Sequence, residues 1–377
     1  MHDVVVVGGG PVGLYAALAL RQAGLDVVVV ERRTARSGHS RAIGIHPPAL
    51  AALKSGDVSG ALQARGVRIT EGIARSAGRE VATLSFAALP GEHRYVLAVP
   101  QAVTEEVLED RLAGRFPGTL RRGTTVTGLV ERDDRVEIHA ATPGGAEVFE
   151  ARLVVGADGA HSAVRDFAGI RAPGRSYPDC YLMGDFPDGT GDGDSAVLYL
   201  EAAGIVESFP LPGGVRRWVV RLGAPAEPDP HLLSRLIGQR TSVAVDPAGN
   251  TMVSSFEVRS RLAERLVAGR VLLVGDAAHE ISPIGGQGMN LGWLDVEALV
   301  PLITAHLCDG AEIGQQLARF NRTRRRAAGL ARRKAHLNMA LGRPLPPPVL
   351  AARNTAFAHL LSRPAVSSGI ARAFTMQ

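Results

Sequence analysis

The chain has 377 residues, 46% of them hydrophobic, and a formal net charge of +5 at pH 7. A chain of this length can bury a sizeable core, and we expect two closely joined domains. Its two cysteines, Cys180 and Cys308, exclude a disulfide framework and a paired-cysteine metal site, and they favour a reducing compartment. The N-terminal residues lack the pattern of a signal peptide, and no apolar run approaches the ~20 residues that span a bilayer.

The first part of the chain alternates between strand and helix patterns. Residues 3–7 form a β-branched apolar run that ends in glycines, as in a buried parallel strand. A helix is predicted over 11–23, followed by a second buried strand over 26–30 that ends in Glu31. Further on, we predict a helix over 101–115 and a β-meander over 119–156.

From about residue 176 to 258 the pattern changes to short strands separated by Gly, Asp and Pro. This predicts a second, mostly antiparallel sheet, interrupted by a helix near 229–239. The chain then returns to the first domain through a strand at 271–274 and a helix over about 289–307. A basic helix is predicted over 315–341.

A glycine motif lies between the first strand and the first helix. The spacing Gly8-x-Gly10-x-x-Gly13 lets the backbone turn tightly and approach a pyrophosphate, which the helix N-terminus attracts. Glu31 ends the next strand, where a carboxylate can accept hydrogen bonds from ribose hydroxyls. An ordinary glycine-rich turn is the alternative, but the order strand, turn, helix, strand and acid favours a dinucleotide.

Two later stretches repeat the change from an apolar strand to glycine. One contains Asp158 within Gly-Ala-Asp-Gly, and the other contains Asp276 and the glycine loop 285–290. A carboxylate at a strand end can hold polyol hydroxyls, and a loop that opens a helix offers backbone N–H groups to a developing anion. Each motif alone is weak, since Asp-Gly marks many turns. Together, in this order, the three stretches indicate FAD held along its whole length.

The stretches GGGPVGL, GADGAHSAVR and VLLVGDAAHEISPIGGQGMN resemble the motifs of the FAD-dependent aromatic hydroxylases, single-component flavoprotein monooxygenases of the para-hydroxybenzoate hydroxylase type. The resemblance covers residues 1 to about 340. It implies an α/β fold with a discontinuous Rossmann-like FAD-binding domain, a mostly antiparallel substrate sheet and C-terminal helices. The expected division is 1–175 for the first FAD part (with some substrate-domain strands near 70–100), 176–268 for the substrate sheet, 269–340 for the second FAD part and 341–377 for a C-terminal helical segment.

The resemblance also implies roles for single residues. Arg41 would lie beside the pyrophosphate, Gln101 beside the ribityl chain and ring, and Val126 beside the adenine. Asp158 belongs to the motif linked to both FAD and NAD(P)H, and Asp276 would hold the ribityl hydroxyls. The full set of expected cofactor-binding residues is Gly8, Gly10, Gly13, Glu31, Arg32, Arg41, Gln101, Val126, Asp158, Asp276, Gly286, Gln287, Gly288, Met289 and Asn290.

The reaction implied by the resemblance uses NAD(P)H and O2. NAD(P)H reduces the flavin, O2 adds to form a C4a-hydroperoxide, and one oxygen atom passes to a phenolic, quinol or polyketide-type aromatic substrate. The backbone of Pro283 and Gly286 in the flavin loop is expected near the reacting atoms, and no general base or metal site is identified. His279 is interpreted as a structural residue at a helix start near this loop, and His46 and His161 are likewise interpreted as structural.

The sequence also bears on three other functions. A flavin halogenase is excluded, because its WxWxIP motif and catalytic lysine are missing while Trp218 and Trp293 stand alone. A flavin-dependent reductase of an isoprenoid or other lipophilic substrate remains open, and coupling of O2 consumption to product would separate it from a hydroxylase. A scaffold with a degenerate flavin site also remains open, and failure to bind FAD would favour it.

Hydrophobic residues of the second sheet have two interpretations. They line an aromatic substrate pocket, or alternate ones simply form the core face of the sheet. The residues in question are Met183, Tyr199, Phe209 and Trp218, with Phe256 beside them.

The segment 313–377 carries twelve Arg or Lys residues and no acidic residue, so the rest of the chain is net acidic. A solvated helix face that pairs with the acidic body is one interpretation, and peripheral contact with anionic lipid headgroups is the other. Nucleic acid is not expected, because aromatic residues do not interleave with the arginines. We expect a cytoplasmic monomer or homodimer, with or without contact to the inner face of the membrane. The basic cluster comprises Arg319, Arg322, Arg324, Arg325, Arg326, Arg332, Arg333 and Lys334.

Overall fold

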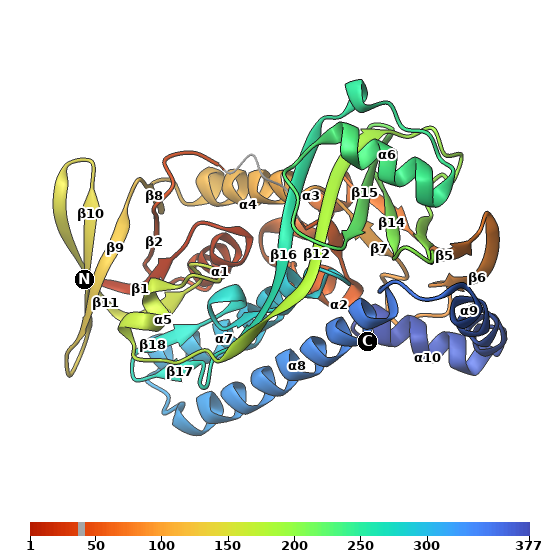
Figure 1. Ribbon diagram of the computed structural model, residues 1–377. Helices are drawn as coiled ribbons and strands as arrows, with labels where there is room; N and C mark the ends of the chain where they lie inside the picture. The colour runs from red at the N-terminus through yellow and green to blue at the C-terminus, as the bar shows by residue number, and fades with distance from the viewer. Residues whose placement is uncertain (37–41) are drawn as a thin grey trace.

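The protein is described by a computed structural model over residues 1–36 and 42–377 (Figure 1). Two large sheets organise it, and the expected α/β class with a Rossmann-like first sheet is confirmed. The first sheet has the order β17-β18-β11-β1-β2-β8, extended by the antiparallel strands β10 and β9. Its strands are β1 (His2–Val7), β2 (Val27–Glu31), β8 (Leu120–Arg122), β9 (Thr125–Glu131), β10 (Val136–Thr142), β11 (Gly145–Gly156), β17 (Val267–Ala268) and β18 (Val271–Leu273).

Four parallel strands of the first sheet end at one edge. Val7 at the end of β1 lies opposite Gly156 of β11 and Val30 of β2, and Gly156 in turn lies opposite Leu273 of β18. The valines of β1 and β2 are buried because helices cover the sheet, as expected of parallel strands. The three glycine-bearing turns therefore meet at the carboxyl edge, where open α/β sheets bind their ligands.

The second sheet has the order β19-β16-β12-β15-β14-β13-β5-β6. It includes two strands from residues 71–85, far from the others in sequence, whereas residues 96–98 pair in a small third sheet. The second sheet contains β5 (Glu71–Ser76), β6 (Arg79–Ser85), β12 (Gly174–Pro187), β13 (Ala196–Tyr199), β14 (Val206–Leu211), β15 (Val215–Leu222), β16 (Met252–Leu262) and β19 (His279–Glu280). The third contains β3 (Gly44–Ile45), β4 (Val67–Ile69) and β7 (Val96–Ala98).

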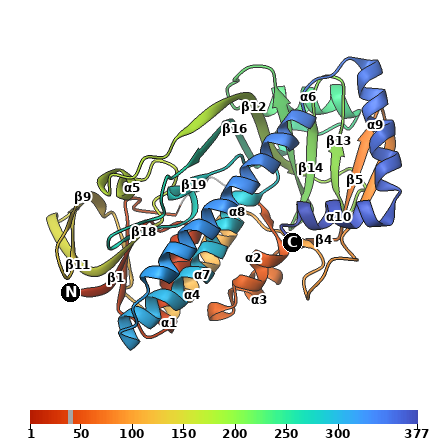
Figure 2. The same cartoon turned by 90° about the horizontal axis from the view of Figure 1, so that it is seen from below.

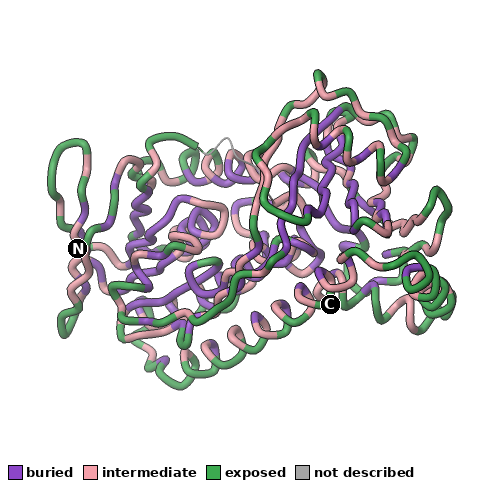
Figure 3. Tube along the Cα trace, viewed as in Figure 1, coloured by how far each residue is buried: buried purple, intermediate pink, exposed green. Residues whose placement is uncertain are grey.

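Helices cover the first sheet and flank the second. α8 runs along the outside of α7, and α9 and α10 lie beyond its C-terminal end (Figures 1 and 2). The strands and inner helices are largely buried, whereas α9 and α10 are mostly exposed (Figure 3). The helices are α1 (Pro11–Gln22), α2 (Pro47–Ala52), α3 (Val58–Gln63), α4 (Gln101–Arg115), α5 (Ala163–Phe167), α6 (Pro230–Thr241), α7 (Gln287–Asp309), α8 (Gly314–Leu341), α9 (Pro347–Leu361) and α10 (Pro364–Phe374), with short 3-10 turns η1 (Ser55–Asp57), η2 (Pro247–Gly249) and η3 (Gly275–Ala277).

Helix α7 has the length and apolar composition of a membrane span, contrary to the expectation that no segment would reach this length. Its residues Trp293, Val296, Leu299 and Ile303 are buried in the core of the first domain. The Trp293 indole N–H donates a hydrogen bond to the Pro11 carbonyl at the start of α1 (3.1 Å). The packing is that of a core helix, which passes the same compositional test as a membrane span.

Candidate active site at the carboxyl edge of the first sheet

The turn between β1 and α1 is built from glycines because the chain approaches itself closely there. Gly8 has a φ of 111°, and a methyl group on Gly13 would overlap the Gly8 carbonyl oxygen. Gly10 caps α1 without a side-chain hydrogen bond, and a methyl group on it would meet nothing within 4 Å. Space is therefore open beside Gly10 at the start of α1, as the approach of a pyrophosphate requires.

Glu31 at the end of β2 is 5% exposed and is held by hydrogen bonds. The Gly9 amide donates to Oε2 (2.6 Å), while the Arg33 amide and Nε donate to Oε1 (2.8 and 3.0 Å). Burial alone would raise the pKa of Glu31, but these hydrogen bonds outweigh it and lower the pKa. Glu31 is therefore a fixed carboxylate beside the glycine turn, and Arg33 is a supporting residue that the motif did not identify.

Asp158 follows β11 and is fixed in the same way. Its carboxylate accepts hydrogen bonds from the Ser162 hydroxyl (2.5 Å) and the Val164 amide (3.1 Å), and burial raises its pKa. The buried Arg165 then donates to the Ala277 carbonyl (3.2 Å), which belongs to the third glycine motif. The second and third motifs are thereby joined through a side chain as well as through the sheet.

Asp276 differs from these two carboxylates. Over residues 1–36 and 42–377 its carboxylate has no hydrogen-bond or ion-pair partner, and the residue is exposed. A methyl group on Gly288 would lie 3.6 Å from its Oδ1, so Asp276 faces the start of α7. The surrounding chain and Glu280 raise its pKa to about 6. Solvent contact argues for a smaller shift, since a hydrated carboxylate keeps most of its ordinary acidity.

The loop from Pro283 to Gly286 turns into α7. The Gly286 amide donates to the Pro283 carbonyl (2.9 Å), and Gly286 caps the helix with a φ of 65° and no side-chain hydrogen bond. The next residues Gln287, Gly288 and Met289 form the first helical turn, whose N–H groups have no partner within the helix. Contact of this turn with the pyrimidine edge of the flavin stays a prediction, and the Pro283 carbonyl is already engaged in the turn.

The side-chain amide of Asn290 is hydrogen-bonded to this loop and to the segment 44–46. Its Nδ2 donates to the carbonyls of Gly286 (2.6 Å) and Gly44 (2.9 Å), and its Oδ1 accepts from the His46 amide (2.8 Å). The buried His46 ring donates from Nε2 to the Gly285 carbonyl (3.1 Å), and burial lowers its pKa to about 4. A neutral His46 thus locks the loop, a role that its sequence neighbours did not signal.

A buried ion-pair network lies behind Asp276. His279 Nε2 contacts Asp295 Oδ2 at 2.7 Å, Arg324 Nε donates to Asp295 Oδ1 at 2.6 Å, and the Gly275 amide also donates to Asp295 (3.1 Å). Burial opposes charge on His279, but Asp295 outweighs it and raises its pKa, while the pKa of Asp295 falls in return. His279 is structural, as interpreted, but it lies in the short strand β19 and not at a helix start.

The remaining predicted cofactor residues are placed as follows. Gln101 begins α4 and donates to Glu105 (2.9 Å), and Val126 is buried in β9 within the core of the first domain. Arg32 is exposed just after Glu31, and Arg41 lies outside the described residues. Contacts of all these residues with FAD stay predictions.

The second sheet separates the four predicted substrate residues onto two faces. Met183 and Phe209 lie in a cluster with Ile284 of the flavin loop and Met339 of α8. Tyr199 and Trp218 stack on each other (5.8 Å between ring centroids) in a different cluster, with Leu233 and Ile237 of α6. The expectation that all four line one pocket is therefore corrected, because successive strand residues point to opposite faces.

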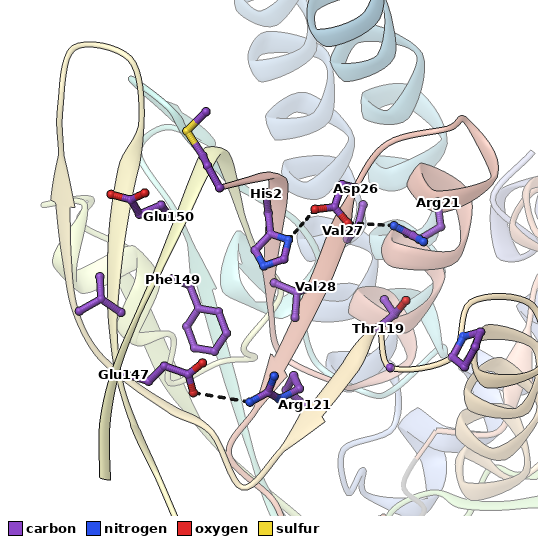
Figure 4. Close-up of a pocket in the computed structure, with 14 residues that line it drawn as sticks. His2, Arg21, Asp26, Val27, Val28, Thr119, Arg121, Glu147, Phe149 and Glu150 are labelled. Carbon is purple, nitrogen blue, oxygen red and sulfur yellow. Dashed lines mark hydrogen bonds and ion pairs between the residues drawn. The ribbon is translucent and has the colours of Figure 1, made fainter. Parts of the chain in front are cut away.

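A surface cavity of about 510 Å³ lies at the opposite edge of the first sheet (Figure 4). Its charged groups pair with one another, as Asp26 does with His2 and Arg21, and Arg121 with Glu147. It adjoins the amino ends of β1 and β2, away from the three glycine turns. Parallel sheets bind ligands at the other edge, so this cavity is not the active site.

Part of the basic cluster of α8 is used inside the protein. Arg325 donates to the Ala263 carbonyl (3.2 Å), Arg332 to the Ser260 hydroxyl (2.8 Å) and Lys334 to the Ala373 carbonyl (3.0 Å), in addition to the Arg324 pair. These contacts tie α8 to the second sheet and to α10. Contact with lipid stays a prediction for the other arginines.

Comparison with known proteins identifies the family of the chain. A family model described as an FAD binding domain matches residues 1–335. The chain is 34% identical over 309 residues to 12-dehydrotetracycline 5-monooxygenase/anhydrotetracycline 6-monooxygenase of Streptomyces rimosus, covering 78% of this chain but only 61% of that protein. It is 30% identical over 325 residues to para-nitrophenol 4-monooxygenase of Pseudomonas sp. strain WBC-3 (82% and 80% covered). The crystal structure of p-nitrophenol 4-monooxygenase PnpA from Pseudomonas putida DLL-E4 superposes with a TM-score of 0.89 at 26% identity, covering 100% of this chain and 98% of that one.

Proposed function

Because this chain belongs to the FAD-binding-domain family that includes the FAD-dependent aromatic hydroxylases, we propose that it is an FAD monooxygenase that uses NAD(P)H and O2 to hydroxylate a phenolic, quinol or polyketide-type aromatic compound. The observation that carries the proposal is the joining of three glycine turns at one sheet edge, beneath an apolar face of a second sheet. The bound flavin supplies the electron transfer to O2 and the transfer of one oxygen atom.

The residues of this chain have separate tasks in the proposal. The turn Gly8–Gly13 and the start of α1 bind the phosphates, and Glu31 holds the ribose. Asp276 holds the ribityl chain, because its carboxylate is free to accept hydrogen bonds. The first turn of α7 offers N–H groups to the pyrimidine edge of the flavin, where negative charge develops on reduction.

The protein also positions the ring and excludes water. His46 and Asn290 fix the loop Pro283–Gly286, so its carbonyl and N–H groups keep their directions during turnover. The cluster of Met183, Val219 and Ile284 closes the space between the loop and the second sheet with apolar side chains. Such an enclosure would exclude water from the ring of a flavin bound there.

The test is a coupled measurement on purified holoenzyme. With a panel of phenols, NAD(P)H oxidation, O2 uptake and hydroxylated product should rise together. NAD(P)H oxidation without oxygen incorporation would instead support a reductase of a lipophilic substrate, and protein that cannot be reconstituted with FAD would contradict both.

A further inference from the structure

A carboxylate without a partner lies in the middle of the second sheet. Glu207 of β14 is 8% exposed, yet its carboxylate makes no hydrogen bond or ion pair with any residue that the structure describes. Its oxygens are not sealed from solvent-sized space, unlike those of the enclosed unpaired groups. Burying a carboxylate without a hydrogen-bond partner costs free energy of folding. We therefore expect a ligand to supply the missing partner of Glu207.

The strand register places Glu207 on the face that looks toward the flavin loop. Glu207 lies opposite Val219 of β15, and Val219 lies opposite Met183 of β12. Paired residues of neighbouring strands share a face. Val219 and Met183 pack in the cluster that contains Ile284 of the loop, so Glu207 lies on the sheet face that carries this cluster.

The arginines of this face are committed to other carboxylates. Arg217 forms a two-pronged pair with Asp185 (2.6 and 2.7 Å), and Arg221 pairs with Asp179 (3.0 Å). Burial is accordingly the one cause that raises the pKa of Glu207, to about 7. The charged and titratable groups near this face include Tyr177, Asp179, Tyr181, Asp185, Arg217, Arg221, His336, Arg343 and Arg353.

A second unpaired polar group lies on the same face of the sheet. The Tyr181 hydroxyl is buried and has no hydrogen-bond partner in the described part of the chain, while its ring stacks on Phe256 (5.4 Å between centroids). β12 and β14 flank β15, so Tyr181 and Glu207 stand on strands about 10 Å apart, two steps of ~4.8 Å. Between the ion pairs of this face, Met183, Val219 and Phe209 supply apolar surface.

We propose that Glu207 binds the aromatic substrate by accepting a hydrogen bond from a hydroxyl group on its ring, with Tyr181 as the second polar contact. This assignment rests on the proposed function for the location of the substrate. A site built around a buried acceptor rejects an analogue of the same size that cannot donate, because the acceptor then stays unpaired. Glu207 therefore determines specificity for hydroxylated rings over their ethers.

The test compares 2-naphthol with 2-methoxynaphthalene as ligands of the oxidised holoenzyme, followed by the perturbation of the flavin absorbance. At pH 8 we expect the wild type to prefer the naphthol by about tenfold or more. The preference should shrink at pH 6, where Glu207 is protonated. Glu207→Leu should abolish the preference, Glu207→Gln should reduce it, and Tyr181→Phe should have a smaller effect.

Glu257→Gln is the matched control, because Glu257 is exposed on β16 and points to the other face of the same sheet. It should keep the wild-type preference. An unchanged preference in Glu207→Leu, or none in the wild type, overturns the assignment. If Glu207→Leu lacks flavin, the wild-type comparison of pH 6 with pH 8 decides, and a preference independent of pH contradicts the role of Glu207.

The outcome for Glu207 is separable from that for the proposed function. Hydroxylated product formed with coupled O2 uptake, together with an unchanged preference in Glu207→Leu, would refute only the assignment of Glu207. Loss of the preference without any hydroxylated product would support the binding site and refute the monooxygenase.

Discussion

Buried carboxylates in the two sheets differ in the number of hydrogen bonds that they accept from the protein. At the carboxyl edge of the first sheet, Glu31, Asp158 and Asp295 each accept two or more hydrogen bonds from the protein. At the centre of the second sheet, Glu207 has none from the described residues. The first arrangement fixes the carboxylates without a ligand, as the proposed cofactor site requires. The second leaves a cost that a ligand can offset, which is the physical signature of a recognition site.

The largest effect on stability should come from removing Asp295, a buried carboxylate that is fully paired at the edge of the first sheet. Asp295→Ala leaves His279 and Arg324 buried without their common partner, and we expect the free energy of unfolding to fall by about 3–5 kcal/mol. Urea unfolding of the holoenzyme measures it. Glu297→Ala, at an exposed position two residues further along α7, should change stability by less than about 0.5 kcal/mol. Similar values for both variants would contradict the role of the network.

The contribution of His46 to the free energy of unfolding should depend on pH in a defined direction. The pKa of His46 is lowered from 6.5 to about 4 in the folded protein, so the unfolded chain binds more protons between these values. Stability should therefore fall by about 3 kcal/mol as pH falls through this range. His46→Gln keeps a donor for the Gly285 carbonyl and cannot titrate. The unfolding free energy of His46→Gln should lack this part of the acid dependence. If the variant and the wild type had the same pH profile, the titration of His46 would not be its cause.

The contribution of Glu207 to the free energy of unfolding should change with pH in the opposite direction. Its folded pKa is raised from 4.5 to about 7, so the native state binds more protons and loses stability as pH rises through that range. We expect Glu207→Gln to gain about 2 kcal/mol on the wild type between pH 4.5 and 8, after allowance for residual solvent contact. Thermal unfolding at several pH values tests this, and a constant difference would mean that Glu207 has a partner.

The smallest effect concerns Asp276, whose carboxylate has no partner among the described residues and lies in the proposed cofactor site. Asp276→Ala removes an acceptor for the ribityl hydroxyls, and FAD should bind about tenfold more weakly, equivalent to about 1.4 kcal/mol. Fluorescence titration of the apoprotein with FAD measures it. Asp194→Ala, at an exposed loop position, provides the control. Unchanged flavin affinity in Asp276→Ala would remove Asp276 from the site.

Local sequence signals predicted the elements that form the site. The helix expected over 101–115 is α4 with the same bounds, and the buried strand and glycine turn at residues 3–13 have the expected form. These features depend on residues near one another in the chain: a β-branched run, a helical period and glycines at a tight turn. The sequence also indicated that Asp158 and Asp276 follow strand ends, which places them at one edge of a parallel sheet.

Other parts of the site depend on contacts across long separations. Asn290 meets the His46 amide 244 residues away, and Arg165 meets the Ala277 carbonyl 112 residues away. No local pattern signals such pairs.

Glycine turns and strand-end acids act through the nearby backbone, so the amino-acid sequence was enough to predict the residues of the proposed cofactor site. Which side chains of the second sheet approach the loop Pro283–Gly286 depended on tertiary packing. The alternation of the second sheet shows that Met183 and Trp218 point apart, but not which of the two faces covers the loop. That depends on where the chain returns through Ile284, and this packing placed Trp218 on the face toward α6 and Glu207 on the face toward the loop.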